Sequence, residues 1–129
     1  ERIRCGGAGI GGFYSPVGIG TVLTEGKRVE RIDGRDYVLE KPLRADFALL
    51  KGRQADTMGN IVYNKTARNF GPLMAMAAST TIVQASAVVS LGKLDPEAVV
   101  TPGIFVDRVI AVVNPEHESA LVAAGASYP

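Results

Sequence analysis

The feature that most limits how this chain can fold is a glycine-rich segment near its beginning. Between Gly6 and Thr21, seven of the sixteen residues are glycine, and Gly7, Gly9 and Gly12 have the spacing G-x-G-x-x-G. Ordering so much glycine costs conformational entropy, which makes sense where backbone must lie close to a ligand or to another chain. The segment is therefore either a binding loop or a plain glycine-rich connection.

The G-x-G-x-x-G spacing lacks the surroundings of a dinucleotide-binding loop. Such a loop follows a strand, opens a long helix and has an acidic residue about 20 residues later. Here residues 1–4 look like the last turn of a helix that Gly6 and Gly7 end, and Pro16 prevents a long helix after the loop. No Gly-Lys-Ser/Thr follows any glycine run, so a Walker-type phosphate loop is excluded as well.

A β-hairpin is the clearest local prediction. Val29–Ile32 alternates apolar and charged residues, Asp33-Gly34 follows, and Arg35–Glu40 is again rich in strand formers. Asp-Gly between two such runs favours a type I′ turn, because both central residues then need positive φ. The charges predict an exposed antiparallel ribbon whose acidic side chains, Glu40 included, are solvated.

The rest of the chain alternates apolar runs with short helices. Residues 45–51 are a continuous apolar run ended by a glycine, which is typical of a strand covered on both faces. Residues 80–85 and 109–113 predict further buried strands, and a helix is expected to start with Pro72 near its first position. A last helix is expected over 116–124. This pattern predicts an α/β fold with an open, mostly parallel sheet, flanking helices and the exposed hairpin.

Composition narrows the function classes. The chain has 129 residues, which suggests one domain, and its net charge of +1 with scattered basic residues argues against a nucleic-acid partner. The chain has no apolar run long enough to span a bilayer, so no membrane role is expected. One cysteine and one histidine exclude an internal disulfide and a structural zinc site, and no metal is expected. A reduced, cytoplasmic setting is the resulting expectation.

Several stretches together resemble one of the two different subunits of the 3-oxoacid CoA-transferases. We call it the first subunit, and we call the one that carries the nucleophile the second subunit. No single stretch is specific, but the match runs in order over nearly the whole chain without large gaps. The matching segments are Gly6–Thr21, Glu25–Lys27, Asp33–Glu40, Asp56–Asn60, Tyr63–Pro72, Leu94–Pro96 and Thr101–Val109.

The resemblance implies a CoA-transferase-like fold, an open α/β sheet with flanking helices, and an enzyme that moves coenzyme A from succinyl-CoA to a 3-oxo acid. In that family a glutamate of the second subunit attacks the acyl-CoA, which gives an acyl-glutamate anhydride and then an enzyme-CoA thioester. The resemblance therefore implies a chain with no catalytic residue of its own, active only with the second subunit in a hetero-oligomer. Coenzyme A is a substrate, and no other cofactor is expected.

Two departures from the family pattern bear on which part of the enzyme this is. The Ser-Glu-Asn-Gly type motif of the nucleophile does not occur here. The N-terminal signature of the first subunit, Gly-Gly-Phe-x-x-x-Gly-x-Pro, is also not matched by Gly11-Gly12-Phe13, because Val17 stands where that signature needs glycine. We therefore expect residues 1–129 to be the C-terminal portion of the single domain of the first subunit.

Three functions remain open at this point. Residues 70–78 and 81–84 look more like the 3-oxoadipate enzymes of aromatic catabolism, although acetoacetate-specific succinyl-CoA:3-ketoacid enzymes share most of them. A second possibility is a glycine-loop module that binds a phosphate or nucleotide without catalysis. A third is a structural fragment with no activity of its own.

The candidate substrate-binding residues fall in two places. The first is the glycine loop with its embedded aromatic pair. The second precedes the expected helix start near Pro72, because cations beside a helix N-terminus suit anionic ligands; an exposed basic turn is the simpler alternative there. The candidates are Gly11, Gly12, Phe13, Tyr14, Ser15, Lys65, Arg68 and Asn69.

Overall fold

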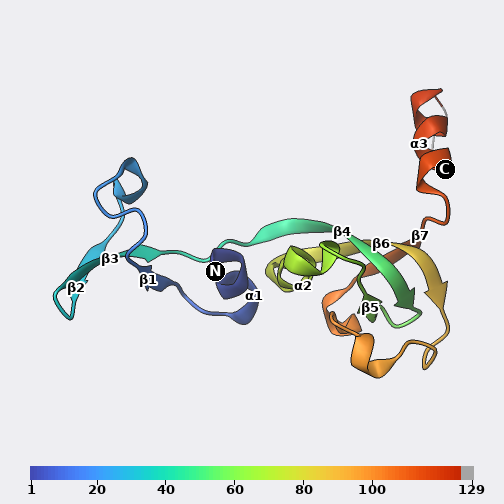
Figure 1. The fold of residues 1–129 in the computed structure, drawn as a ribbon, viewed down its shortest axis with the longest axis horizontal. Helices are drawn as coiled ribbons and strands as arrows, with labels where there is room; N and C mark the ends of the chain where they lie inside the picture. Colours follow the sequence, from blue (N-terminus) through green and yellow to red (C-terminus); the bar gives the residue numbers. More distant parts are fainter. Residues whose placement is uncertain (126–129) are drawn as a thin grey trace.

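The chain forms two separate sheets joined through a helical region (Figure 1). The computed structural model describes residues 1–125. A three-stranded sheet in the order β1-β3-β2 lies at the left of the view, and a four-stranded sheet in the order β5-β4-β6-β7 lies at the right. The elements are α1 (Arg2–Ala8), β1 (Phe13–Ser15), β2 (Val29–Ile32), β3 (Arg35–Glu40), β4 (Ala45–Asp56), β5 (Ile61–Val62), α2 (Ala67–Ala77), β6 (Ala78–Val89), β7 (Arg108–Ala111) and α3 (Pro115–Ala123).

The predicted hairpin is confirmed, and it carries a third strand. Asp33 and Gly34 have φ values of 48° and 78°, the positive values that the two-residue turn requires. Strand β1 pairs antiparallel with the other side of β3, with Phe13 opposite Glu40. This pairing fixes the glycine loop beside the hairpin.

The larger sheet confirms the open, mostly parallel architecture. Strand β4 pairs in parallel with β6, and β6 pairs in parallel with β7, while only the short β5 runs antiparallel to β4. Helix α2 follows β5 and returns the chain to β6. The core lies on the side of the sheet that faces α2, and its buried residues are Ala48, Leu50, Ala55, Ile61, Tyr63, Ala75, Val83 and Ala85.

The expectation for residues 45–51 is wrong in two respects. Strand β4 does not stop at Gly52 but continues to Asp56, because the missing side chain of Gly52 makes room for Ile61, whose Cγ2 lies only 2.8 Å from where a Cβ would stand. The strand is also covered on one face only within residues 1–125: Phe47 and Leu49 are 64% and 74% exposed.

Two helix boundaries also differ from the sequence expectation. Gly6 and Gly7 lie inside α1, which ends instead at Gly9 with φ of 70°. A Cβ on Gly7 would come within 2.5 Å of the Cβ of Met76, so the glycines serve close packing of α1 on α2 rather than termination. Helix α2 begins at Ala67 and contains Pro72 in its interior, where the proline removes one helical hydrogen bond.

The strand expected over 109–113 is present as β7, but it ends at Ala111 and is largely exposed within residues 1–125, because it is an edge strand of the sheet. Asp95 caps a 3-10 turn, η2 (Pro96–Ala98), by accepting a hydrogen bond from the amide of Glu97. The C-terminal helix is present as α3, and it projects away from the sheet in Figure 1. Over residues 1–125, no helix combines the length and the apolar character needed to cross a membrane.

Candidate functional site

The glycine loop leads into a strand, which is incompatible with a dinucleotide-binding loop. Strand β1 follows it where such a loop would open a helix. Gly12 has φ of 148°, and a Cβ there would lie 2.8 Å from the carbonyl oxygen of Glu40. Within the described part of the chain, the backbone amides of Gly11 and Gly12 have no acceptor. Residues 1–125 therefore leave these two adjacent amides without a hydrogen-bond partner.

An apolar pocket adjoins this loop. Its volume is about 380 Å³, and Phe13 and Ser15 of β1 contribute to its wall. Tyr14 lies between them on the strand and is half-buried, like both neighbours. The apolar side chains around the pocket also include Ile3, Val17, Leu23 and Leu43.

A second, basic cavity shares Arg2 and Glu40 with the apolar pocket. Its volume is about 490 Å³, and its lining residues are Arg2, Gly26, Lys27, Arg28, Leu39, Glu40 and Lys41. Four of these residues are cationic and only one is acidic. Their spread over residues 2–41 explains why no sequence motif indicated the cavity.

Glu40 is not solvated as the hairpin pattern predicted. Its side chain is 17% exposed, and its carboxylate accepts a hydrogen bond of 2.7 Å from Lys27 Nζ and lies 3.8 Å from Arg2 Nε. Lys27 faces Glu40 because the register of the hairpin continues past Val29 and Val38, whereas Arg2 reaches it through the packing of α1, which no local pattern encodes. Glu40 therefore holds two cations at the edge of the cavity.

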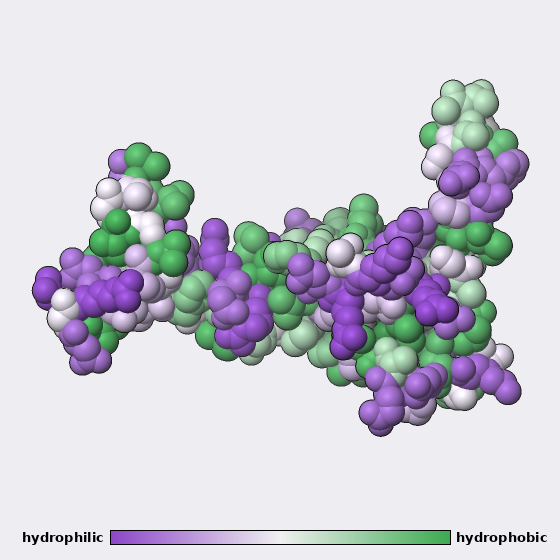
Figure 2. All heavy atoms as spheres, in the orientation of Figure 1, coloured by the Kyte–Doolittle hydropathy of each residue, from purple (hydrophilic) through white to green (hydrophobic). Residues whose placement is uncertain are grey.

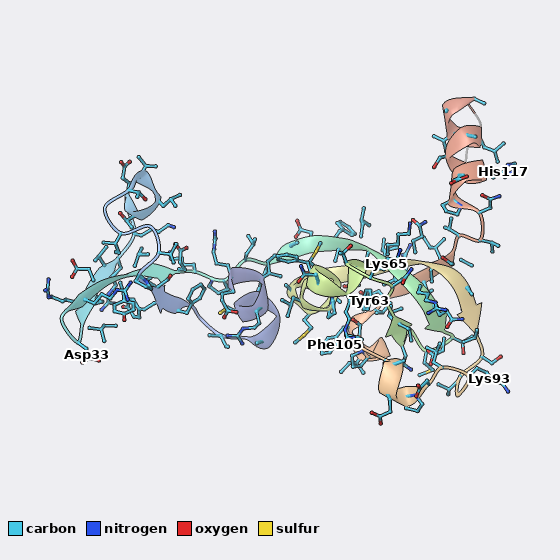
Figure 3. The ribbon with its side chains drawn as sticks, in the orientation of Figure 1. Asp33, Tyr63, Lys65, Lys93, Phe105 and His117 are labelled. Atoms are coloured by element: carbon cyan, nitrogen blue, oxygen red, sulfur yellow. The ribbon has the colours of Figure 1, made fainter. Side chains whose placement is uncertain are left out.

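The second group of candidates lies elsewhere in the molecule. Lys65 lies two residues before α2, Arg68 and Asn69 lie in its first turn, and all three residues are exposed. Figure 3 shows Lys65 and Tyr63 beside the four-stranded sheet, whereas Asp33 marks the far end of the hairpin. The structure thus brings Gly11 to Ser15 together, and Lys65 to Asn69 together, but it does not join the two groups.

A buried polar cluster ties the end of β4 to the loop before β7. Asp56 is 3% exposed, and its carboxylate accepts hydrogen bonds from the amides of Met58 and Asn60, both 3.0 Å, and from Asn60 Nδ2 at 2.8 Å. Asn60 Oδ1 in turn accepts from the amide of Gly103 at 2.9 Å. Because these side chains are fully engaged with one another, the cluster has a structural role.

Acid should weaken this cluster. Burial raises the pKa of Asp56, but the hydrogen bonds from Asn60, Met58 and Gly59 lower it more, so the pKa lies below its ordinary value of 3.8. A carboxyl group whose pKa is lower in the folded than in the unfolded protein stabilises the fold. This stabilisation is complete above the pKa of the group in the unfolded protein, and it is lost as the pH falls through its pKa in the folded protein. We expect Asp56→Asn to cost about 1–3 kcal/mol at pH 7. In denaturant titrations this cost should stay constant down to about pH 4 and shrink below it; a constant cost at lower pH would contradict the assignment.

Comparison with known proteins agrees with this architecture. The family model described as Coenzyme A transferase matches residues 1–112. The chain is 62% identical over 112 residues to the first subunit of the 3-oxoadipate CoA-transferase of Pseudomonas putida, covering 87% of this chain and 48% of the relative. It is 50% identical over 116 residues to the first subunit of the probable succinyl-CoA:3-ketoacid coenzyme A transferase of Bacillus subtilis strain 168, covering 90% and 49%. The chain thus spans about half the length of the curated relatives it matches.

Solved structures share the fold at low sequence identity. The apoenzyme of an acyl-CoA transferase from Escherichia coli O157:H7 superposes with a TM-score of 0.79 at 21% identity, over 86% of this chain and 25% of that one. Glutaconate coenzyme A-transferase from Acidaminococcus fermentans gives 0.75 at 19% identity, over 86% and 42%. The predicted CoA-transferase-like fold is confirmed.

Proposed function

We propose a function from the fact that the chain belongs to the coenzyme A transferase family. The chain is part of the first subunit of an enzyme that moves coenzyme A from succinyl-CoA to a 3-oxo acid. The observation that carries this proposal is the identity of 62% and 50% to subunits named for 3-oxoadipate and succinyl-CoA:3-ketoacid transfer. The exchange converts succinyl-CoA and the 3-oxo acid into succinate and the 3-oxoacyl-CoA.

Within that class we propose 3-oxoadipate as the acceptor. Two relatives named for 3-oxoadipate are 62% and 60% identical to this chain. Two named for succinyl-CoA:3-ketoacid transfer are both 50% identical. The acetoacetate-specific enzyme is the alternative.

The glycine loop has the donors that a thioester substrate needs. When a nucleophile attacks a thioester, negative charge develops on the carbonyl oxygen, and preorganised amide donors stabilise it. We assign this role to the amides of Gly11 and Gly12, which have no acceptor within residues 1–125. Phe13, Tyr14 and Ser15 would then position the substrate along β1. The neighbouring cavity, with Arg2, Lys27, Arg28 and Lys41, fits an anionic part of the same substrate.

The nucleophile is proposed to come from the second subunit. The two acidic side chains that line the pocket beside the loop already have cationic partners: Glu40 pairs with Lys27, and Glu1 pairs with Arg4. A carboxylate held in this way is a weaker nucleophile than a free one. The proposed active site therefore forms only when the second subunit places its glutamate beside the glycine loop.

The loop between β1 and β2 is a suitable contact for the second subunit. Val17, Val22 and Leu23 are exposed on it, the latter two on the short 3-10 helix η1 (Val22–Thr24). Figure 2 shows apolar side chains gathered on this loop, where it rises from the three-stranded sheet. Exposed apolar groups beside a binding loop are typical of protein contacts.

The acceptor test compares two acids. The full-length first subunit, containing this segment, is assembled with the second, and kcat/KM is measured for 3-oxoadipate and for acetoacetate with succinyl-CoA as donor. We expect a higher kcat/KM for 3-oxoadipate. A preference for acetoacetate would select the alternative enzyme, and turnover with neither acid would remove the 3-oxoacid function.

The distal carboxylate of 3-oxoadipate needs a cation, and acetoacetate has no such carboxylate. The basic cavity beside the glycine loop contains Lys41, whereas Lys65 and Arg68 lie at the start of α2, away from this loop. We therefore expect Lys41→Met to lower kcat/KM for 3-oxoadipate a few-fold, or about 1 kcal/mol, and to leave acetoacetate turnover unchanged. Lys65→Met and Arg68→Met are the matched controls, and a loss at either of them that is confined to 3-oxoadipate would contradict the placement of this carboxylate in the cavity.

A further inference from the structure

The apolar pocket beside the glycine loop takes part of its wall from the loop that follows β1. Phe13 and Ser15 line the pocket from β1 itself, and they share one face of the strand because they are two residues apart. Leu23 lines the same pocket from the 3-10 helix η1, and its side chain is 60% exposed. The pocket is therefore shaped both by a sheet strand and by a surface loop, which rises from the three-stranded sheet in Figure 1.

Hydrogen bonds within this loop hold Leu23 in place. The hydroxyl of Thr21 donates to the carbonyl oxygen of Gly18 at 2.7 Å and accepts from the amide of Leu23 at 3.3 Å. The hydroxyl of Thr24 donates to the carbonyl oxygen of Thr21 at 2.9 Å. Gly18 has φ of 88°, and a Cβ there would lie 3.2 Å from the Cβ of Leu23, so the chain turns tightly beside this side chain. The loop thus presents Leu23 to the pocket as a preformed part of its wall.

The pocket adjoins the groups proposed to bind the two ends of the acid. Gly12, one of the two proposed amide donors, directly precedes Phe13 in the pocket wall. Arg2 and Glu40 line both the apolar pocket and the basic cavity, so the two hollows are neighbours. In 3-oxoadipate, two methylenes separate the ketone from the distal carboxylate. With the reacting end at the glycine loop and the distal carboxylate in the basic cavity, these methylenes lie in the apolar pocket.

We infer that Leu23 is a specificity-determining residue, which limits the chain length of the 3-oxo acid by limiting the room for its methylenes. The inference rests on the proposed function and refines it. An apolar pocket discriminates between chains that differ by one methylene by about 10–200-fold. Shortening Leu23 enlarges the pocket without touching the pairing of β1 with β3, because Leu23 belongs to neither strand. Its neighbour Val22 is also exposed but does not line the pocket.

The test compares two 3-oxo dicarboxylic acids in the assembled enzyme. Leu23→Ala is introduced into the full-length first subunit, and kcat/KM is measured for 3-oxoadipate and for 3-oxosuberate, which has two more methylenes. We expect the ratio of 3-oxosuberate to 3-oxoadipate to rise about 10-fold or more. Val22→Ala is the control within the same loop, and Leu91→Ala is the control at a leucine of similar exposure, 62%, outside both hollows. Weakened assembly lowers turnover of both acids alike and leaves the ratio unchanged. An unchanged ratio in Leu23→Ala, or an equal rise in Val22→Ala, would overturn the inference.

Thiol labelling separates this inference from the proposed function. Leu23→Cys and Leu91→Cys are alkylated with iodoacetamide in the assembled enzyme, and mass spectrometry follows the peptide that spans each position; the native Cys5 of this segment is 0% exposed. Increasing 3-oxoadipyl-CoA should slow the labelling of position 23 until the effect saturates, and should leave position 91 unaffected. Turnover by the parent enzyme without protection of position 23 would overturn this inference and leave the proposed function standing. Turnover of neither acid by the parent enzyme would remove both.

Discussion

Gly12→Val should lower kcat of the assembled transferase by about 10²–10³-fold, the usual cost of losing an amide donor to a developing oxyanion. Valine is strained at φ of 148°, and its Cβ would lie 2.8 Å from the carbonyl oxygen of Glu40. That oxygen belongs to the backbone of β3 and cannot rotate away. The loop must therefore move, and the proposed amide donors of Gly11 and Gly12 move with it. The measurement is single-turnover transfer from succinyl-CoA.

Gly92→Val is the matched control for this effect. Gly92 also has positive φ, 81°, but a Cβ there would meet nothing within 4 Å, and it lies outside the loop proposed to contact the second subunit. The control variant therefore has backbone strain of the same kind, without the clash and outside Gly11 to Ser15. We expect its kcat to stay within a few-fold of the parent value. Unchanged activity of Gly12→Val in an assembled enzyme would refute the placement of the loop at the reacting group.

Gly103→Val should cost the largest amount of stability, about 2–4 kcal/mol. Gly103 begins the 3-10 turn η3 (Gly103–Phe105), and a Cβ there would overlap the carbonyl oxygen of Met58. Relief of that overlap would also break the bond from the Gly103 amide to Asn60 Oδ1. The overpacking and the lost hydrogen bond act on the same cluster that holds Asp56, so their effects add locally.

Gly11→Val is the control, because Gly11 has an ordinary φ and open space around the position of a Cβ. Urea titrations of the two variants should differ in midpoint and not in slope. If Gly103→Val were as stable as Gly11→Val, the close approach of η3 to the β4–β5 turn would be contradicted.

The hairpin and the parallel sheet were predictable because their signals are local or periodic. Asp33-Gly34 encodes its own turn through two positive φ values, independently of the rest of the chain. The apolar runs at β4, β6 and β7 likewise indicated strands that pair in parallel, although β7 is largely exposed within residues 1–125.

The failures share one physical origin, which is contact between segments distant in sequence. Gly7 looked like a helix terminator, but it is helical because Met76 packs against its backbone. The hairpin pattern predicted a solvated Glu40, but in the structure Arg2 and Lys27 lie against its carboxylate. The exposed face of β4 could not be predicted either. A continuous apolar run has the same sequence pattern whether or not residues of this chain cover the second face of the strand.

The candidate site was only partly predictable for the same reason. Gly11 to Ser15 stay together because they are contiguous, and β1 aligns them with β3. The cations of the neighbouring cavity come from α1, from the loop before β2 and from the end of β3. No single stretch of sequence contains them, so only the fold brings them together.

The central claim is that this chain contributes to CoA transfer only together with a second subunit that supplies the nucleophile. The decisive measurement follows succinyl-CoA and 3-oxoadipyl-CoA by liquid chromatography, with the full-length first subunit containing this segment, with the second subunit, and with the two combined. We predict transfer to 3-oxoadipate by the combined subunits and none by either one separately. Transfer by the first subunit in the absence of the second would contradict the claim.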